Sequence, residues 1–303
     1  MTKLTQFQQE ISGLLPHISF KFQEPMSSHT SFRIGGPAEV MAFPRSSQEL
    51  AELLKASAAM GIKAAVLGAG TNILAPDEGL PGLTICLKDC LNGMECMDDN
   101  RIRVAAGVTM TRAAVFAANH GLSGMEFAHG IPGTVGGGVY MNAGAYGGEI
   151  CQICESVDVM DDDGTLKTYS CQQMEFSYRH SILEEKGGIV VSAVFALTPG
   201  NRIQIKATMK ALMEKRSASQ PLDLPSAGSA FKRPAGGYAS ALIDQCGLRG
   251  FTVGNAAVSQ KHTGFAVNLG GATAQDVKNL LQQVSDIVFE KTGFRLEPEV
   301  RIW

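Results

Sequence analysis

The spacing of apolar residues predicts that the first two thirds of the chain alternates strands with a few helices. Residues 47–60 carry leucines at helical spacing, with Ser46 or Ser47 as the N-terminal cap. A second helix is predicted over 111–122, ending at Gly121, because glycine accepts the left-handed conformation that closes helices. Apolar runs predict strands over 63–70, 101–108 and 188–199, and a hairpin over 155–170.

The pattern changes near residue 200, where we expect a domain boundary. Residues 202–220 predict a strand edge followed by a helix, and residues 237–247 predict a short helix. The clearest helix covers 272–293, because Thr273 and Asp276 have capping-box spacing and apolar residues then follow on one face. The sequence therefore predicts a mixed α and β protein of two domains.

Composition places the chain among ordinary globular proteins. Its 303 residues are 45% apolar and 18% charged, and the formal net charge is −3. No basic patch suggests nucleic-acid binding. The N-terminal stretch lacks an apolar signal core, and no apolar run reaches membrane-spanning length. We therefore expect a cytoplasmic protein that does not bind nucleic acid and does not insert into a membrane.

The seven cysteines do not form an obvious framework. An odd count in a cytoplasmic chain argues against disulfides. Cys151 and Cys154 form a CxxC pair, which is either a redox or metal pair or two small buried residues. No second CxxC or CxxH follows at the spacing of a zinc site, so we favour the second interpretation and expect no metal.

Two glycine-rich loops could lie against a ligand. VLGAGTN at 66–72 follows an apolar strand, but the third glycine of a Rossmann fingerprint is missing and prolines follow, so no helix can begin there. The second loop is GIPGTVGGGVYMNAGAYGGE at 130–149, and its residues 131–137 could form an anion nest of backbone N–H groups. Two such loops favour one extended dinucleotide held between them.

Six motifs in order resemble the UDP-N-acetylenolpyruvoylglucosamine reductase (MurB) family of flavoenzymes. Besides the two glycine loops, they are HTSFRIGGPA at 29–38, FSYRHS at 176–181, KRSASQPLDLPSAGSAFKRP at 215–234 and LEPEVRIW at 296–303. The short spacing between Arg179 and the GSAFKRP segment resembles the shorter, type II branch, which lacks the substrate-covering tyrosine loop of the longer branch.

The resemblance implies a fold, a cofactor and a reaction. The expected fold is α+β: a two-subdomain FAD-binding fold of the vanillyl-alcohol-oxidase type followed by an α+β substrate domain. The FAD-binding domain is expected over 1–200, with subdomains of about 1–78 and 79–200, and the substrate domain over 201–303, its last strand returning to the flavin. The implied activity is that of a UDP-N-acetylmuramate dehydrogenase in peptidoglycan precursor synthesis, with FAD held noncovalently and NADPH as electron donor.

The resemblance also implies three catalytic residues. Arg179 would stabilise the enolate that follows hydride transfer, since a guanidinium binds a carboxylate with two hydrogen bonds. Ser229 would donate the proton, assisted by Glu299. Without the family, a surface salt-bridge arginine and a turn serine would be the preferred explanations of Arg179 and Ser229, and Glu299 could be a strand-end acid paired with Arg301.

Two groups of binding residues follow from the same motifs. The expected FAD contacts are Arg33, Leu67, Gly68, Ala69, Gly70, Thr71, Asn72, Ile131, Pro132, Gly133, Thr134, Gly136, Gly137, Asn142, Ala143 and Gly144. The expected substrate contacts are Lys215, Lys232, Arg233 and His262. Arg233 stands where many relatives have asparagine. His29 and Thr30 are expected near the FAD without a covalent link.

Two other functions remain open at this point. One is a flavin oxidase of carbinol substrates on the same fold, which would react rapidly with oxygen. The other is a noncatalytic nucleotide-binding protein, which would purify without a yellow colour.

Overall fold

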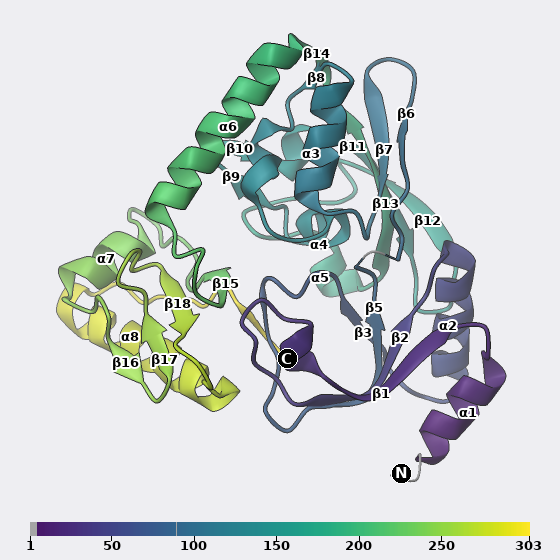
Figure 1. Ribbon diagram of the computed structural model, residues 1–303, viewed down its shortest axis with the longest axis horizontal. Helices are drawn as coiled ribbons and strands as arrows, with labels where there is room; N and C mark the ends of the chain where they lie inside the picture. Colours follow the sequence, from purple (N-terminus) through teal and green to yellow (C-terminus); the bar gives the residue numbers. More distant parts are fainter. Residues whose placement is uncertain (1–4, 89) are drawn as a thin grey trace. The chain divides into compact units, whose positions relative to one another are not determined.

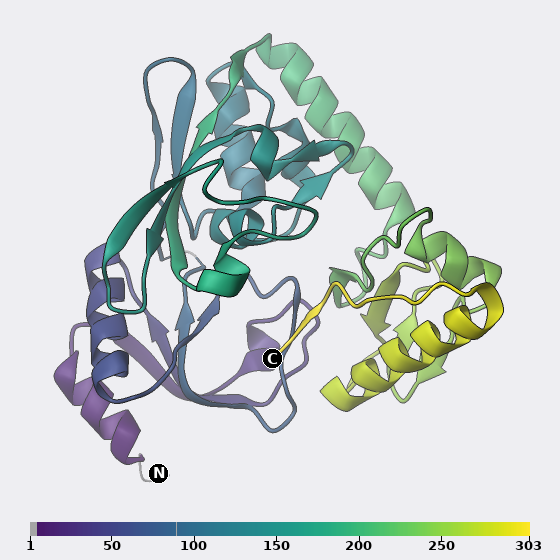
Figure 2. The same cartoon turned by 180° about the vertical axis from the view of Figure 1, so that it is seen from behind.

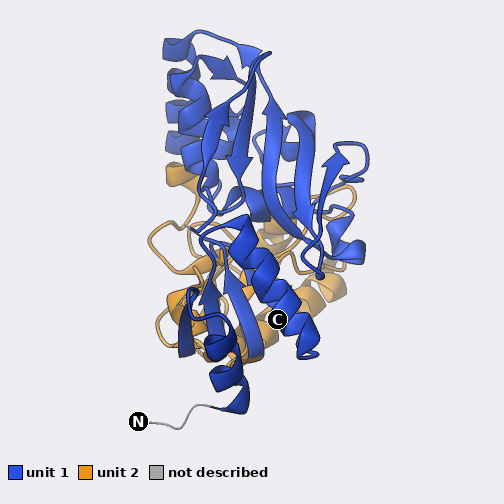
Figure 3. Cartoon of the chain, turned by 90° about the vertical axis from the view of Figure 1, so that its right-hand side faces the viewer, with its two compact units in different colours: residues 1–22, 39–69, 82–215 blue, residues 23–38, 70–81, 216–303 orange. Residues whose placement is uncertain are grey.

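The computed structural model describes residues 5–88 and 90–303, which divide into two compact units (Figure 3). Unit 1 contains residues 39–69 and 82–215 together with the N-terminal segment up to residue 22. Unit 2 contains residues 23–38, 70–81 and 216–303. This division differs from the predicted one in two respects: unit 1 continues to Lys215 instead of ending near residue 200, and two early segments belong to unit 2.

Unit 1 contains most of one sheet and the whole of a second, both drawn in Figure 1. The first has the strand order β1-β2-β5-β3, and the second has the order β12-β11-β13-β7-β6. The strands of the first sheet are β1 (Ser19–Pro25), β2 (Pro37–Phe43), β3 (Ala65–Leu67) and β5 (Leu80–Cys86). Those of the second are β6 (Met94–Cys96), β7 (Arg101–Ala105), β11 (Cys154–Met160), β12 (Leu166–Ser170) and β13 (Ile189–Ala196).

Helices α2 and α3 of unit 1 begin at polar caps. Ser46 accepts a hydrogen bond from the Glu49 amide at 3.1 Å and starts α2, and Thr109 does the same for α3. The α-helices of unit 1 are α1 (Gln6–Leu14), α2 (Ser47–Ala59), α3 (Met110–Asn119), α4 (Val135–Tyr140), α5 (Leu183–Lys186) and α6 (Arg202–Ser219). Its short elements are β8 (Leu122–Ser123), η2 (Glu126–Gly130), β9 (Gly144–Ala145), β10 (Gly148–Glu149), η3 (Ile150–Gln152) and β14 (Thr198–Pro199).

The start of α6 corrects one prediction. The alternation in RIQIK suggested a strand edge, but the helix begins at Arg202. The side chain of Asn201 accepts hydrogen bonds from the Ile203 and Gln204 amides, which caps the first turn. Ile203 is 81% exposed and Ile205 is buried, as helical geometry at these positions requires.

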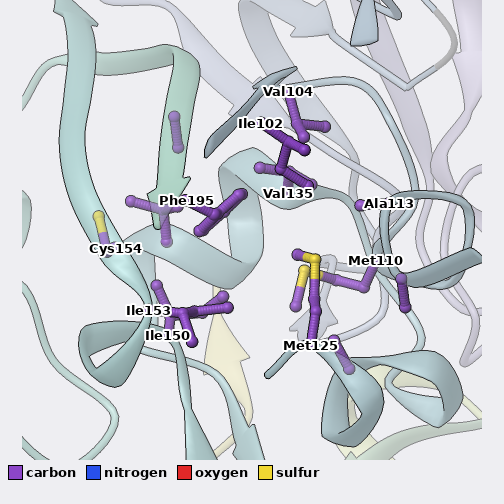
Figure 4. Close-up of a cluster of buried hydrophobic side chains, with 14 of the residues drawn as sticks. Ile102, Val104, Met110, Ala113, Met125, Val135, Ile150, Ile153, Cys154 and Phe195 are labelled. Atoms are coloured by element: carbon purple, nitrogen blue, oxygen red, sulfur yellow. The ribbon is translucent and has the colours of Figure 1, made fainter. Parts of the chain in front are cut away.

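Strand β13 is packed on both faces, which accounts for its continuous apolar sequence. Val190 and Phe195 belong to a cluster with α3 and α4, part of which is drawn in Figure 4, whereas Ile189 joins a second cluster with α2 and β5. A strand buried on both faces needs apolar residues throughout its length. Val135 of α4 lies in the first cluster, so the glycine-rich run is anchored on this core.

Unit 2 is built around an antiparallel sheet of order β15-β18-β17-β16, visible from behind in Figure 2. Its elements are η1 (Met26–Ser28), β4 (Ile73–Leu74), β15 (Ser226–Ser229), α7 (Ala239–Gln245), β16 (Thr252–Val253), β17 (Ala256–Val258), β18 (Phe265–Asn268), α8 (Ala274–Thr292) and β19 (Arg301–Ile302). The predicted capping box of α8 is confirmed between Thr273 and Asp276. Gly293, with a φ of 78°, ends the helix.

Long-range contacts bring the two early segments into unit 2. The buried Asn268 side chain donates to the Phe32 carbonyl at 3.0 Å, and β4 pairs in parallel with β19. Asp77 accepts hydrogen bonds from the Ala274 and Gln275 amides at the start of α8. These bonds join residues far apart in the sequence, which explains why local periodicity does not predict them.

Candidate functional site

Ser229 ends β15, at the point where the strand meets the C-terminal segment. Ser229 pairs with Phe265 across the unit 2 sheet. The Ala230 amide donates to the Gly264 carbonyl at 2.8 Å, and the Ala230 carbonyl accepts a hydrogen bond from the Glu299 amide at 2.9 Å. The two backbone groups of Ala230 therefore hold the neighbouring Ser229 between β18 and Glu299.

The two glutamates of the C-terminal motif differ in their surroundings. Phe231 forms a bridge with Pro298, and the Lys232 amide donates to the Glu297 carbonyl. The exposed Glu297 carboxylate also pairs with the Lys232 ammonium at 2.5 Å. Glu299 is half-buried and is the glutamate next to the Ser229–Ala230 segment. Glu299 is therefore the glutamate whose backbone adjoins the residue that follows Ser229, whereas the Glu297 side chain is paired with Lys232.

Asn72, at the end of the first glycine loop, contacts the same C-terminal segment. Its side chain donates to the Glu299 carbonyl at 3.2 Å, and its own carbonyl accepts from the Arg301 amide at 3.0 Å. Unit 2 thus brings together a predicted cofactor contact, Asn72, and two predicted catalytic residues, Glu299 and Ser229.

Gly70 packs directly against the 29–38 motif. It has a φ of 61°, and a Cβ atom there would collide with the His29 carbonyl oxygen. The Ser31 amide donates to the Gly70 carbonyl at 3.0 Å, while the Ser31 hydroxyl donates to the Ser226 carbonyl at 2.6 Å. Sequence reasoning missed Ser31, because a serine between two motif residues carries no distinguishing signal.

The other side chains of the 29–38 motif have separate roles. The buried Thr30 hydroxyl donates to the Ile34 carbonyl, and a His29 ring nitrogen lies 2.8 Å from the Glu24 carboxylate. Arg33 is exposed and has a φ of 55°. Thr30 is thus engaged within the loop, whereas Arg33 presents its guanidinium at the surface of unit 2.

Fewer backbone amides of residues 131–137 are available for an anion than the predicted nest requires. Thr134 caps α4 and accepts from the Gly137 amide at 3.4 Å. The Val135 and Gly136 amides donate to carbonyl oxygens of the segment 106–108, at 2.7 and 2.9 Å. These amides anchor the loop on the unit 1 core, so they are not donors for a phosphate.

The remaining part of this loop fits a ligand that passes close to the backbone. Among the described residues, the Gly133 and Thr134 amides have no acceptor, and Gly133 has a φ of 130°. Outside its own helix, a Cβ at Gly137 would approach only the Thr134 hydroxyl oxygen, at 3.7 Å, among the described residues. A Cβ at Gly68 would lie 2.6 Å from the same oxygen, so the two glycine loops adjoin in unit 1.

Arg179 projects from a tight turn in unit 1. Ser177 and His180 exchange backbone hydrogen bonds of 3.2 Å, and Arg179 between them has a φ of 58°. This conformation is uncommon for a residue with a side chain, and such outliers concentrate at functional sites. The guanidinium donates to the Gly144 carbonyl at 3.3 Å and lies 4.9 Å from the Tyr178 ring centroid.

Asn142 is buried beneath this turn, with a φ of 41°. Its amide nitrogen donates to the Ser177 carbonyl at 2.9 Å and to the Glu149 carboxylate at 3.2 Å. Its side-chain oxygen accepts from the Cys151 amide at 3.0 Å. The side chain predicted to contact the cofactor therefore has both of its donor hydrogens engaged within the chain.

The predicted substrate contacts are spread over both units. In unit 1, the Lys215 ammonium lies 5.6 Å from the Tyr146 ring centroid. In unit 2, the Arg233 guanidinium lies 4.4 Å from the ring of Tyr238, and Lys232 pairs with Glu297.

His262 belongs to the turn that supports Ala230. Its Nδ1 accepts from the Gly264 amide at 3.1 Å, and its ring meets Phe265 edge-on with centroids 5.1 Å apart. Burial lowers the pKa of His262, and the charge of Arg249 acts in the same direction. Both effects favour the neutral imidazole, whose ring contacts Phe265, the residue that pairs with Ser229 across the sheet.

Cys154 of the CxxC pair is buried, and Cys151 is partly buried. Burial, with the neighbouring Cys171 and Cys151 thiols, raises the pKa of Cys154 to about 12. A thiol that resists ionisation is a poor nucleophile and a poor metal ligand. Among the described residues, no group of three or more His, Cys, Asp or Glu side chains could hold a metal ion, and no helix is long and apolar enough to cross a membrane.

Comparison with known proteins finds a matching family model for each of the two halves of the chain. A family model described as "FAD binding domain" matches residues 38–170, and one described as "UDP-N-acetylenolpyruvoylglucosamine reductase, C-terminal domain" matches residues 220–303. The UDP-N-acetylenolpyruvoylglucosamine reductase of Lactobacillus helveticus is 47% identical, over 94% of this chain and 95% of that protein. That of Caldanaerobacter subterraneus is 46% identical, over 97% and 96%. The crystal structure of the Thermus caldophilus enzyme (MurB) is 35% identical, covers 94% and 98% of the two chains, and superposes with a TM-score of 0.78.

Proposed function

Because the chain belongs to the UDP-N-acetylenolpyruvoylglucosamine reductase family of FAD-dependent oxidoreductases, we propose that it uses NADPH to reduce UDP-N-acetylenolpyruvoylglucosamine to UDP-N-acetylmuramate. The observation that carries the proposal is the hydrogen bond between the Glu299 amide and the Ala230 carbonyl. It supports a role for Ser229 and Glu299 as a pair, and such a pair is what proton delivery to a reduced enolpyruvyl group requires.

The binding site for FAD is proposed to use the two glycine loops. The Gly133 and Thr134 amides would donate to the diphosphate, and the bare backbone at Gly137 would allow the close approach. The further contacts are assigned to Arg33, Leu67–Asn72, Ile131, Pro132, Gly136, Ala143 and Gly144. When bound, FAD supplies the hydride, which it receives from NADPH. No covalent link is expected, so acid-denatured protein should release its yellow colour into the supernatant.

Arg179 is proposed to stabilise the negative charge that develops on the substrate. Hydride addition to the terminal carbon of the enolpyruvyl double bond leaves an enolate on its carboxylate. A guanidinium can donate two hydrogen bonds to this group, and charge that develops in the transition state gains most from a donor fixed in advance. The tight turn and the Gly144 contact support such a fixed placement.

Ser229 is proposed to deliver the proton to the neighbouring carbon. A hydroxyl is a weak acid, so it acts only when positioned within hydrogen-bond distance of a strongly basic carbon. The Glu299 carboxylate would orient the hydroxyl and assist its reprotonation. The sugar nucleotide diphosphate would be bound by the cations Lys215, Lys232 and Arg233, with His262 as a neutral polar contact.

The test is a steady-state assay on the purified yellow protein. NADPH consumption should depend on UDP-N-acetylenolpyruvoylglucosamine, with one UDP-N-acetylmuramate formed for each NADPH oxidised. Equal NADPH consumption with and without this substrate would contradict the proposal.

A further inference from the structure

The buried amide of Asn142 connects the glycine-rich run to the turn that carries Arg179. One of its two donor hydrogens goes to the Ser177 carbonyl and the other to the Glu149 carboxylate, at 2.9 and 3.2 Å. The side chain is 1% exposed, so its donors have no competing bulk water. Removal of a buried donor leaves its acceptors unsatisfied, which makes these bonds costly to lose.

The first connection acts on the backbone of Arg179. The Ser177 carbonyl accepts both the His180 amide, which closes the turn, and the Asn142 amide. The turn forces Arg179 into a φ of 58°, and a strained conformation persists only where surrounding bonds hold it. Asn142 supplies one of these bonds from outside the turn.

The second connection acts on the guanidinium of Arg179. Its Nη2 donates to the Gly144 carbonyl at 3.3 Å, and Gly144 pairs with Glu149 in the β9–β10 hairpin. Glu149 in turn accepts the Asn142 amide. Both the backbone and the head group of Arg179 are therefore linked to Asn142.

We propose that Asn142 is a positioning residue for substrate reduction, because its amide fixes the turn and the guanidinium of Arg179. This role rests on the proposed function, in which Arg179 stabilises the enolate. It replaces the expectation that the Asn142 side chain contacts FAD, since both of its donor hydrogens are already used within unit 1. The group acts through Arg179 and touches neither cofactor nor substrate.

Two substitutions distinguish the role of the Asn142 side-chain amide from that of its backbone conformation. Asn142→Asp keeps an acceptor for the Cys151 amide but loses both donors. Asn142→Gly removes the side chain while glycine tolerates the φ of 41° without strain. In anaerobic stopped-flow experiments, both holoenzymes should be reduced by NADPH at the wild-type rate. Their reduced forms should react with UDP-N-acetylenolpyruvoylglucosamine about 10²-fold more slowly, because a small misplacement of a catalytic group has this cost.

Two readouts distinguish positioning from a general loss of structure. Asn142→Asp places a second carboxylate beside Glu149, which raises the pKa of one of the pair, and the proton gained as pH falls restores a donor. Its substrate half-reaction should therefore recover at low pH relative to wild type, whereas that of Asn142→Gly should not. Hydrogen exchange at the His180 amide should be faster in both variants.

A double-mutant cycle tests whether Asn142 acts through Arg179. In an Arg179→Ala background, Asn142→Asp should cause no further loss in the substrate half-reaction, because interacting residues are not additive. The matched control is Asn268→Asp, which converts a buried, bonded amide in unit 2. It should lower the thermal midpoint without changing the ratio of the two half-reaction rates.

Three outcomes would overturn the inference. They are a wild-type substrate half-reaction in both variants, additive losses in the cycle, and loss of bound FAD or of folded protein in both variants. The last would make Asn142 a cofactor or folding residue. If wild-type enzyme itself fails to transfer electrons to the enolpyruvyl substrate, the proposed function fails instead, so the two failures are distinguishable.

Discussion

The backbone amide of Glu299 lies 2.9 Å from the carbonyl oxygen of Ala230, the residue that follows Ser229. This hydrogen bond joins the C-terminal motif to the end of β15. It places the candidate proton donor and its assisting carboxylate on adjacent segments of one unit. Backbone pairing fixes their positions more firmly than two flexible side chains could.

Glu299→Gln should impair substrate reduction selectively. The amide keeps the size of the side chain but removes the carboxylate that assists Ser229, and general acid–base assistance contributes roughly 10² to 10⁴-fold. The rate of the substrate half-reaction should fall within this range, with flavin reduction by NADPH preserved. The matched control is Glu297→Gln, which breaks only an exposed ion pair with Lys232 and should barely change either rate. Equal effects of the two substitutions would contradict the assignment of Glu299.

Substitution of Arg179 should separate activity from stability. Arg179→Gly and Arg179→Ala both remove the guanidinium, so both should lose the substrate half-reaction. Glycine adopts the φ of 58° without strain, so Arg179→Gly should unfold with a free energy about 1 kcal/mol higher than Arg179→Ala. Urea unfolding monitored by circular dichroism measures this difference. A more stable alanine variant would show that the turn is not strained.

Asp77 should stabilise unit 2 through the start of α8. Its carboxylate accepts hydrogen bonds from the Ala274 and Gln275 amides at 2.7 and 3.1 Å, where the helix dipole favours negative charge. Asp77→Ala should lower the free energy of unfolding by about 1 kcal/mol, the typical value of a lost cap. Asp77→Asn, which keeps an acceptor oxygen, should lose less. Equal losses in chemical denaturation would show that the hydrogen bonds contribute nothing.

His262 should make the protein less stable as pH falls below neutrality. Burial lowers its pKa in the folded state below the ordinary value of 6.5, so the unfolded chain binds more protons in the window just below 6.5. The free energy of unfolding therefore rises with pH through this window. His262→Gln should reduce the difference in unfolding free energy between pH 7 and pH 5.

His180 provides the control of opposite sign. Its hydrogen bond to Glu185 raises its pKa, so its contribution to stability is present below 6.5 and is lost as pH rises through the folded value. His180→Gln should therefore enlarge the difference between pH 7 and pH 5. A larger pH 7 to pH 5 difference in His262→Gln would contradict the His262 assignment, and a smaller one in His180→Gln would contradict the His180 assignment.

Local signals in the sequence predicted much of the fold. The capping box of α8 and the hairpin over 155–170 depend on neighbouring residues, and both are confirmed. The prediction for the start of α6 was wrong. The alternating isoleucines of RIQIK suggested a strand, and the opposing signal was a single capping residue, Asn201. The inclusion of segments 23–38 and 70–81 in unit 2 depends on long-range pairing, which no local pattern contains.

For the candidate site, the sequence indicated which residues to consider but not their hydrogen-bond partners. The motif order indicated Arg179, Ser229 and Glu299, whose assigned roles remain predictions. The sequence could not predict that the Val135 and Gly136 amides are used by the core, or that the Asn142 amide is used beneath the turn. Both facts depend on the partners that folding brings close, and asparagine or glycine in a loop fits many such environments.

The most direct test of the account is a comparison of the two half-reactions in Ser229→Ala. The Ser229 side chain is exposed, so its loss should leave folding and FAD binding unchanged. Anaerobic stopped-flow should show wild-type flavin reduction by NADPH, followed by reoxidation by UDP-N-acetylenolpyruvoylglucosamine that is slower by roughly 10² to 10⁴-fold. Reoxidation at the wild-type rate, or an equal loss in both half-reactions, would contradict the assignment of Ser229 as the proton donor.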